Sequence, residues 1–313
     1  MANISAQQVK ELRELTDCGI MDCKKALMES DGDIEKAKAW LREKGMAKAE
    51  KKSSRIAAEG AVYSKITDDK KTGVMVEVNV ETDFAANTDK FKNFVDAIAT
   101  DILETKPADR DTLLASNLYN DPSKTIEVFT KEAIADIGEN ISVRRFVIYE
   151  VNGNGAVASY IHMGGKVGVM TEIVVGDDTV IGTDAFANFA KDIGMQIAAS
   201  NPNWVSEADV PADEIAKETE IVKNKALEEG KPENIIMDRI VPGQIKNFFK
   251  LNCLLDQEFV KDDSMNVASY VANVAKDLGT EISIVSFTRY GLGEGIEKKV
   301  DDFAEEVRKQ AGL

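Results

Sequence analysis

The feature of this 313-residue chain that most limits its possible folds is an internal repeat. The segment Gly-Ala-Val-Tyr-Ser at 60–64 recurs as Gly-Ala-Val-Ala-Ser at 155–159, and residues 73–77 recur at 168–172, both 95 positions further on. Residues 136–143 recur at 277–284, which is 141 positions further on, so the second copy holds about 46 additional residues. Self-similarity at a fixed spacing indicates one structural unit used twice. The repeat therefore predicts that the chain contains a duplicated core.

Each copy has the pattern strand, strand, helix, helix, strand. Residues 74–81 alternate between valine and another residue type, which is typical of a half-buried strand. Residues 91–102 place Phe91, Phe94, Ile98 and Ile102 on one helical face, and the second copy repeats these residue types. The first two strands of each copy are close in sequence, so we expect antiparallel hairpins. The expected fold class is α+β, with a duplicated core of antiparallel sheets that carry helices on one face.

Other segments flank or interrupt this core. Three short helices are expected at the N-terminus, with a capping box at Ser5 and Gln8, inward-facing Leu15, an N-cap at Asp33 and a stop at Gly45. A helical hairpin is expected in the second copy, with a kink or break at Pro242. The expected divisions are a three-helix domain 1–52, a core subdomain 53–150, a second core subdomain 151–290 with the hairpin at about 211–263, and a C-terminal helical module 291–313.

Composition narrows the possible partners and the location. The chain has 39 Lys and Arg against 55 Asp and Glu, a net charge of −16. Binding to phosphate backbones depends on basic side chains, so we expect no direct nucleic-acid binding and no anionic-membrane binding. No apolar run of transmembrane length occurs, and the N-terminus lacks the apolar core of a signal peptide. Three cysteines, an odd number, favour a reducing compartment, so we expect a cytoplasmic protein.

Motifs for catalysis or cofactor binding are weak. The glycines of residues 162–168 and 291–295 do not have the spacing of a phosphate-binding loop. His162 is the only histidine, so a Ser-His-Asp triad would need it, and it stands at an expected hairpin turn. Cys18 and Cys23 are too far apart for a Cys-x-x-Cys zinc motif. We expect no catalytic residues, no metal ligands and no cofactor.

One short stretch remains unexplained by core packing. Thr82, Asp83 and Phe84 follow the valine-rich strand directly and precede the next helix. In one interpretation, Thr82 or Asp83 caps a helix and Phe84 packs beneath it as a hydrophobic staple. In the other, the acid and the aromatic ring are exposed for a partner.

A resemblance favours the second interpretation. The stretches "VKELRELTDCGIMDCKKALMESDGDIEKAKAWLREKG", "RIAAEGAV", "ETDFAANTDKF", "SYIHMGGKVGV", "EEGKPENIIMDRIVPGQIKNF" and "LLDQEFVKDD" resemble, in the same order, the bacterial elongation factor Ts family of exchange factors for elongation factor Tu. The resemblance covers essentially the whole chain. It implies a ubiquitin-associated-like three-helix bundle, a two-part core with a coiled-coil insertion, and a C-terminal helical module.

The resemblance also implies a function and a site. Family members bind elongation factor Tu, GDP-bound and nucleotide-free, and promote GDP release. Asp83 and Phe84 would be the wedge that enters its GTPase domain and disturbs the magnesium and phosphate site, with Thr82 holding the strand end. Ala85 and Ala86 precede Asn87 where the family usually has valine and a basic residue. The members of this implied wedge are Thr82, Asp83, Phe84, Ala85 and Asn87.

Weaker contacts are implied at two other places. His162, Met163 and Gly164 are similar to the family's contact with a β-barrel domain of elongation factor Tu, the alternative being a plain exposed turn. Phe303 and Val307 of the expected C-terminal helix would contact the GTPase domain or dock on the chain itself. Two further function classes are considered: a scaffold indifferent to nucleotide, and a hydrolase that uses two of the many carboxylates. The resemblance favours an exchange factor, which performs no covalent chemistry.

Overall fold

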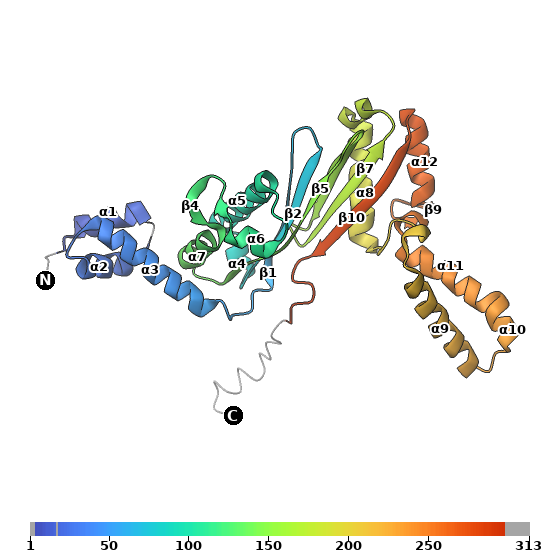
Figure 1. Ribbon diagram of the computed structural model, residues 1–313, viewed down its shortest axis with the longest axis horizontal. Coiled ribbons are helices and arrows are strands. Elements are labelled where there is room, and N and C mark those ends of the chain that lie inside the picture. Colours follow the sequence, from blue (N-terminus) through green and yellow to red (C-terminus); the bar gives the residue numbers. More distant parts are fainter. Residues whose placement is uncertain (1–3, 17, 298–313) are drawn as a thin grey trace. The chain divides into compact units, whose positions relative to one another are not determined.

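The computed structural model describes residues 4–16 and 18–297 (Figure 1). Helices alternate with antiparallel strand pairs, which confirms the predicted α+β class. By their internal contacts the residues form two compact units. The first contains Met1–Tyr63, Val76–Phe146 and Gly291–Leu313, and the second contains Ser64–Met75 and Val147–Tyr290.

Three helices begin the first unit: α1 (Ala6–Thr16), α2 (Ile20–Glu29) and α3 (Ile34–Lys52). They surround a small core that includes Leu12, Leu27 and Leu41. Gln8 and Ser5 form the expected reciprocal cap, because the Ser5 amide donates to Gln8 Oε1 (3.0 Å) and the Gln8 amide to Ser5 Oγ (3.2 Å). The predicted N-cap at Asp33 is also present, with its carboxylate accepting from the Lys36 amide.

Two expectations for these helices are wrong. Gly45 does not end the third helix, which continues to Lys52. A glycine inside a helix costs only about 1 kcal/mol, and here it allows close packing, because a Cβ at Gly45 would lie 3.1 Å from the Cβ of Ala135. Leu15 was expected to face inward, but 56% of its surface is exposed. The small core is filled without it.

The first copy of the repeat supplies a three-stranded sheet in the order β1-β2-β5. Its strands are β1 (Glu59–Ile66), β2 (Thr72–Val80) and β5 (Ile141–Glu150). Between β2 and β5 the chain forms α4 (Asp83–Ala86), α5 (Asp89–Thr105), α6 (Arg110–Ala115), β3 (Asn117–Leu118), β4 (Asp121–Thr125) and α7 (Ile126–Ile137). Phe91, Ile98 and Ile102 of α5 are fully buried, as their spacing predicted.

The second copy supplies a sheet in the equivalent order, β10-β7-β6. Strands β6 (Gly155–His162) and β7 (Val167–Val175) form an antiparallel hairpin in which His162 pairs with Val167. The remaining elements are the 3₁₀ turn η1 (Asp178–Gly182), α8 (Asp184–Ser200), the short strands β8 (Glu258–Phe259) and β9 (Asp262–Asn266), α12 (Val267–Leu278) and β10 (Ile282–Gly291). Phe186, Phe189 and Ile193 lie in the core of this sheet and its helices.

The two copies agree in detail. Helices α5 and α8 each have 17 residues, are capped by Thr88 and Thr183, and end at left-handed residues, Lys106 (φ 47°) and Asn201 (φ 45°). The short pairs β3–β4 and β8–β9, which the sequence pattern did not predict, are held in equivalent ways. Asp101 accepts from the amide of Tyr119, and Gln196 accepts from the amide of Val260 (2.8 Å).

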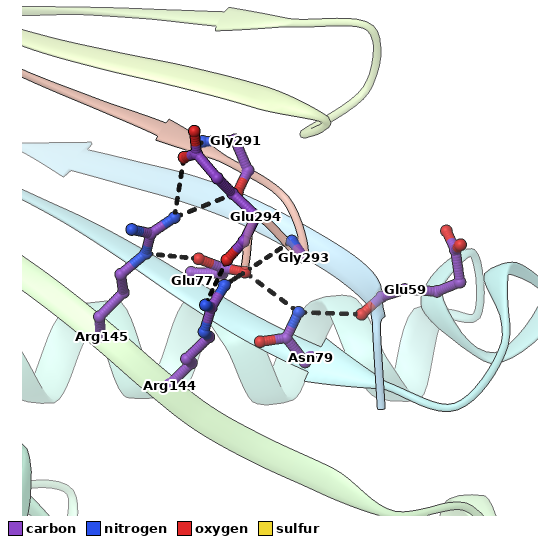
Figure 2. A network of polar contacts seen from close by, with 8 residues as sticks. All are labelled: Glu59, Glu77, Asn79, Arg144, Arg145, Gly291, Gly293 and Glu294. Carbon is purple, nitrogen blue, oxygen red and sulfur yellow. Dashed lines mark hydrogen bonds and ion pairs between the residues drawn. The ribbon is translucent and has the colours of Figure 1, made fainter. Parts of the chain in front are cut away.

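Strand β2 departs from the half-buried pattern. Its valines are buried as expected, but Met75, Glu77 and Asn79 on the opposite face are also at most 1% exposed. The alternation correctly separated the two faces and wrongly assigned one of them to solvent. The second face is covered by arginine side chains from β5 and by residues 291–294 (Figure 2).

The insertion of the second copy is helical. After the 3₁₀ turn η2 (Glu207–Asp209) come α9 (Ala212–Glu228), α10 (Glu233–Ile235), the π-helical turn η3 (Ile236–Ile240) and α11 (Val241–Asn252). Pro242 does not break the returning helix. The irregularity is the π-helical turn immediately before it, since proline cannot donate to the preceding turn. The helices end at Asn252 and are followed by the 3₁₀ turn η4 (Leu254–Asp256), whereas the insertion was expected to continue to about residue 263.

The expected C-terminal helix lies outside the described residues, apart from its first positions. Within residues 4–16 and 18–297, no helix is both long enough and apolar enough to cross a membrane.

Candidate partner-binding site

Phe84 is the most exposed large apolar side chain at the predicted site. It lies on α4, a single helical turn at the end of β2, and 84% of its surface is exposed. The hydrophobic-staple interpretation is therefore wrong, because a staple would bury the ring. Asp83 beside it is also exposed, whereas Ala85, the next residue, is buried. The turn thus points its alanine into the protein and presents the acid and the ring to solvent.

The start of this turn is fixed by Thr82 and Glu139. The Thr82 hydroxyl accepts a hydrogen bond from the Ala85 amide (3.2 Å), which makes Thr82 the N-cap. Glu139, in the loop between α7 and β5, accepts from both the Thr82 amide (2.9 Å) and the Thr82 hydroxyl (2.8 Å). Hydrogen bonds to an ionised carboxylate are stronger than neutral ones. The strand end is therefore attached to a loop far away in the sequence.

The end of the turn is fixed by Asn87 and Thr88. The Asn87 side chain donates to the Asp83 carbonyl (2.8 Å), and the Thr88 hydroxyl donates to the Ala85 carbonyl (2.7 Å). Thr88 also accepts from the Phe91 amide, so the same residue caps α5. These bonds satisfy groups at both ends of a one-turn helix that could not be stable alone. Phe84 is consequently held on a rigid support.

The second copy of the repeat shows that the fold does not require this phenylalanine. The 3₁₀ turn η1 occupies the positions equivalent to α4, and Thr179 stands where Phe84 stands in the first copy. Val180 and Ile181 of η1 are buried, 7% and 8% exposed. Asp178, equivalent to Asp83, accepts from Lys71 Nζ (2.8 Å) and the Gly155 amide (2.8 Å), which hold its pKa below the usual value.

His162, Met163 and Gly164 lie at the β6–β7 turn, as predicted. Met163 is 67% exposed and adopts φ 49°, and Gly164 follows with φ 64°. The His162 ring stacks on Tyr160 at 5.8 Å, and His162 Nδ1 is 3.1 Å from the Tyr160 hydroxyl. The turn thus presents a methionine and an imidazole side by side. It belongs to the second compact unit, whereas Phe84 belongs to the first.

Some site residues were missed, and others fall outside the structure. Glu139 was missed because only its long-range hydrogen bonds to Thr82 reveal it, and the sequence carries no signal for that pairing. Phe303 and Val307 lie outside the described residues. Within the described residues, no group of three or more His, Cys, Asp or Glu side chains could hold a metal ion.

A capped turn that displays an acid and an exposed aromatic ring has the character of a protein-binding site, since aromatic anchors dominate such interfaces. The family model described as Elongation factor TS matches residues 81–294, a range that begins one residue before Thr82.

Curated relatives resemble the chain over almost its whole length. Elongation factor Ts of Trichlorobacter lovleyi is 47% identical over 310 residues, which is 99% of both chains. The proteins of that name from Clostridium perfringens and Halothermothrix orenii are each 48% identical, over 99% and 98% of both chains. The chain belongs to the elongation factor Ts family.

Proposed function

We propose that this protein is a guanine-nucleotide exchange factor for elongation factor Tu. It binds the GDP complex and inserts Asp83 and Phe84 into the GTPase domain. This insertion disturbs the magnesium and phosphate site, and GDP leaves. The observation that carries the proposal is Phe84, 84% exposed on a turn capped at both ends, in a chain of the elongation factor Ts family. Thr82, Ala85 and Asn87 support the wedge.

Thermodynamic linkage explains how such a wedge acts without a nucleotide site of its own. A factor that binds the nucleotide-free partner more tightly than the GDP complex must weaken GDP binding by the same factor. An acceleration of about 10³- to 10⁴-fold requires about 4 to 5.5 kcal/mol of nucleotide destabilisation. One aromatic anchor contributes about 2 kcal/mol or more to a typical interface. Phe84 together with a lost metal contact is sufficient for this magnitude.

The direct test is stopped-flow release of a fluorescent GDP from elongation factor Tu. We expect the wild-type protein to accelerate release and Phe84→Ala to lower the second-order rate constant by about thirtyfold or more, equivalent to about 2 kcal/mol. Asp83→Asn measures how much the Asp83 carboxylate contributes to the acceleration of GDP release. Tyr119→Ala is the matched control, because Tyr119 is another exposed aromatic residue (52%) of the same compact unit.

The outcomes separate the three function classes. Acceleration that is lost in Phe84→Ala and kept in Tyr119→Ala supports the wedge. Full acceleration by Phe84→Ala refutes the role of the ring. Binding to elongation factor Tu that is equal with and without GDP indicates a scaffold. Turnover that depends on pH and survives the loss of Phe84 indicates a hydrolase.

The remaining contacts belong to the same proposal. The turn at His162, Met163 and Gly164 would contact a β-barrel domain of elongation factor Tu, and Met163, 67% exposed, is suited to an adaptable apolar contact. Met163→Ala should weaken the complex in a titration while leaving the unfolding midpoint unchanged. Phe303 and Val307 would contact the GTPase domain.

Further details of the proposal concern the rest of the chain. The N-terminal helices would form a ubiquitin-associated-like domain, with the division at residues 52 and 53. The protein would act in the cytoplasm, without covalent chemistry, without a cofactor, and without direct contact to nucleic acid or membrane.

A further inference from the structure

Strand β2, which ends at the Thr82–Asn87 turn, also carries a fully buried carboxylate. Glu77 is 0% exposed and has four hydrogen-bond donors (Figure 2). Arg144 Nη1 lies 2.8 Å from Glu77 Oε1, and Arg145 Nε lies 2.6 Å from Glu77 Oε2. The Asn79 side chain (3.1 Å) and the main-chain amide of Gly293 (2.8 Å) also donate to Oε1. Gly293 belongs to residues 291–297, which we call the C-terminal segment. It lies 216 positions from Glu77 in the sequence.

The C-terminal segment adds further contacts to this cluster. Two guanidinium groups face the single carboxylate of Glu77 on β2. Glu294 supplies the second carboxylate, 3.6 Å from Arg145 Nη2. Arg145 also donates to the Gly291 carbonyl (3.1 Å), and Arg144 donates to the Glu294 carbonyl. Burial raises the pKa of Glu77, but the donors from Gly293, the arginines and Asn79 outweigh it, and the pKa lies below its usual value. The ionised form is thus the one the cluster favours.

Gly293 fits this place because it has no side chain. Its φ is +69°, a conformation that residues other than glycine rarely adopt. A Cβ at this position would lie 2.5 Å from the carbonyl oxygen of Ala58, which is part of the main chain and cannot turn aside. The segment therefore passes so close to the backbone of Ala58 that a side chain at position 293 would clash with it.

The second copy of the repeat lacks this cluster, so a sheet of this type does not need it. Glu172 is equivalent to Glu77, and Val285 and Ser286 are equivalent to Arg144 and Arg145. Glu172 is only partly buried and accepts from the Ser286 hydroxyl (3.0 Å). Strand β7 nevertheless occupies the same central position in its sheet. The arginine pair and the buried carboxylate are a feature of the first copy alone, where the C-terminal segment arrives.

We propose that Glu77 is a positioning residue for partner binding, which fixes the start of the C-terminal segment at Gly293 to the strand that ends at the Thr82–Asn87 turn. We call this attachment of Gly293 to Glu77 the clamp. The inference rests on the proposed function, because it assumes that both the turn and the chain beyond Glu297 contact the partner. Because Glu77 is fully buried, it would act without contacting the partner or the nucleotide. It holds two contacting segments on one strand, so that the binding of one reduces the entropy cost of binding the other.

The test loosens the segment while leaving the sheet intact. Gly293→Ala keeps Glu77 and both arginines and places a methyl group against Ala58. Gly295→Ala is the matched control, since Gly295 has a similar φ of +75° but its Cβ would meet nothing closer than Arg144 Nη2 at 3.8 Å. Amide hydrogen exchange of the full-length protein reports docking directly. We expect the protection factor of the main-chain amide at position 293 to fall at least about tenfold in Gly293→Ala and in Glu77→Gln, and not in Gly295→Ala.

The GDP-release assay then reports function. Gly293→Ala should lower the rate constant about tenfold, and should have no further effect in a Phe303→Ala background, because both changes then remove the same contribution. Unchanged protection in Gly293→Ala, or an equal loss in Gly295→Ala, would overturn the clamp. Lost protection with wild-type exchange activity would overturn its role in partner binding. If the wild-type protein itself fails to accelerate GDP release, the proposed function has failed, and the protection measurement still decides whether the clamp exists.

Discussion

Glu139→Ala is the perturbation that most directly examines how the Phe84 turn is held. The change removes the acceptor of two hydrogen bonds, from the Thr82 amide (2.9 Å) and the Thr82 hydroxyl (2.8 Å). Hydrogen bonds to charged groups contribute about 1.5–3 kcal/mol in favourable settings. Glu139 is only partly buried, so water can replace part of the stabilisation that these hydrogen bonds provide. We therefore expect the two hydrogen bonds together to contribute about 2 kcal/mol. That free energy corresponds to about thirtyfold in the equilibrium between the ordered and the disordered turn.

The internal repeat provides a matched control for this variant. Thr280 is equivalent to Glu139, and its hydroxyl accepts from the amide of Asp177 (2.9 Å), the residue equivalent to Thr82. Thr280→Ala therefore removes the corresponding bond from the turn that lacks the exposed phenylalanine. As a single neutral hydrogen bond it should contribute about 1 kcal/mol to the free energy of unfolding.

Two measurements on both variants decide the outcome. Urea unfolding gives the loss of stability, and GDP release from elongation factor Tu gives the loss of exchange activity. We expect Glu139→Ala to slow exchange about ten- to thirtyfold and Thr280→Ala to leave it unchanged. Equal exchange activity of Glu139→Ala and wild type, despite a measured loss of stability, would refute the idea that the rigidity of the turn matters. Equal slowing by both variants would show that general stability, rather than the turn, controls the rate.

Three other expectations follow from burial, charge and backbone geometry. Partly exposed Cys18 should react with iodoacetamide at pH 8 well before buried Cys253, whose pKa burial and nearby carboxylates raise to about 11; faster labelling of Cys253 in peptide mass spectrometry would contradict this. Glu77 has a lowered pKa in the folded state, so its ionised form stabilises the protein above the usual pKa and this contribution is lost as the pH falls below it; Glu77→Gln should make the free energy of unfolding less dependent on pH between about 5 and 3, and an unchanged slope would refute the assignment. Gly60→Ala should destabilise the protein by about 2 kcal/mol or more in urea unfolding, because φ is +127° and a Cβ would lie 2.1 Å from the carbonyl oxygen of Val78; an unchanged midpoint would show that the backbone relaxes.

The sequence predicted those features that depend on neighbouring residues. The caps at Ser5 and Asp33 need partners only three positions away, and the hairpin turn at His162 follows from two adjacent strands. The repeat predicted the equivalent strands and helices because both copies satisfy the same local rules. Only the resemblance predicted that Phe84 is exposed, since pattern alone favoured a staple.

The features that were missed depend on residues distant in the sequence. Glu77 was expected to face solvent, because the polar face of an alternating strand is normally exposed. The sequence gives no sign of its partner Gly293, which is 216 positions away. Glu139 meets Thr82 across 57 positions. The short strands β3 and β4 are too brief to give a periodic signal, and they are fixed by a carboxylate of α5 instead. In each case a single long-range contact outweighs the local pattern.

The helices inserted into the second copy have a consequence for folding. Strand β2 ends at Val80 and its partner β5 begins at Ile141, whereas β7 ends at Val175 and β10 begins at Ile282. The second sheet must therefore close a loop of about 106 residues instead of about 60, and the logarithmic cost of loop closure makes the difference only about 0.5 kcal/mol. The second sheet therefore tolerates its insertion almost without thermodynamic cost. The insertion instead slows the folding of the second sheet, because β10 pairs with β7 only after a longer search through chain conformations.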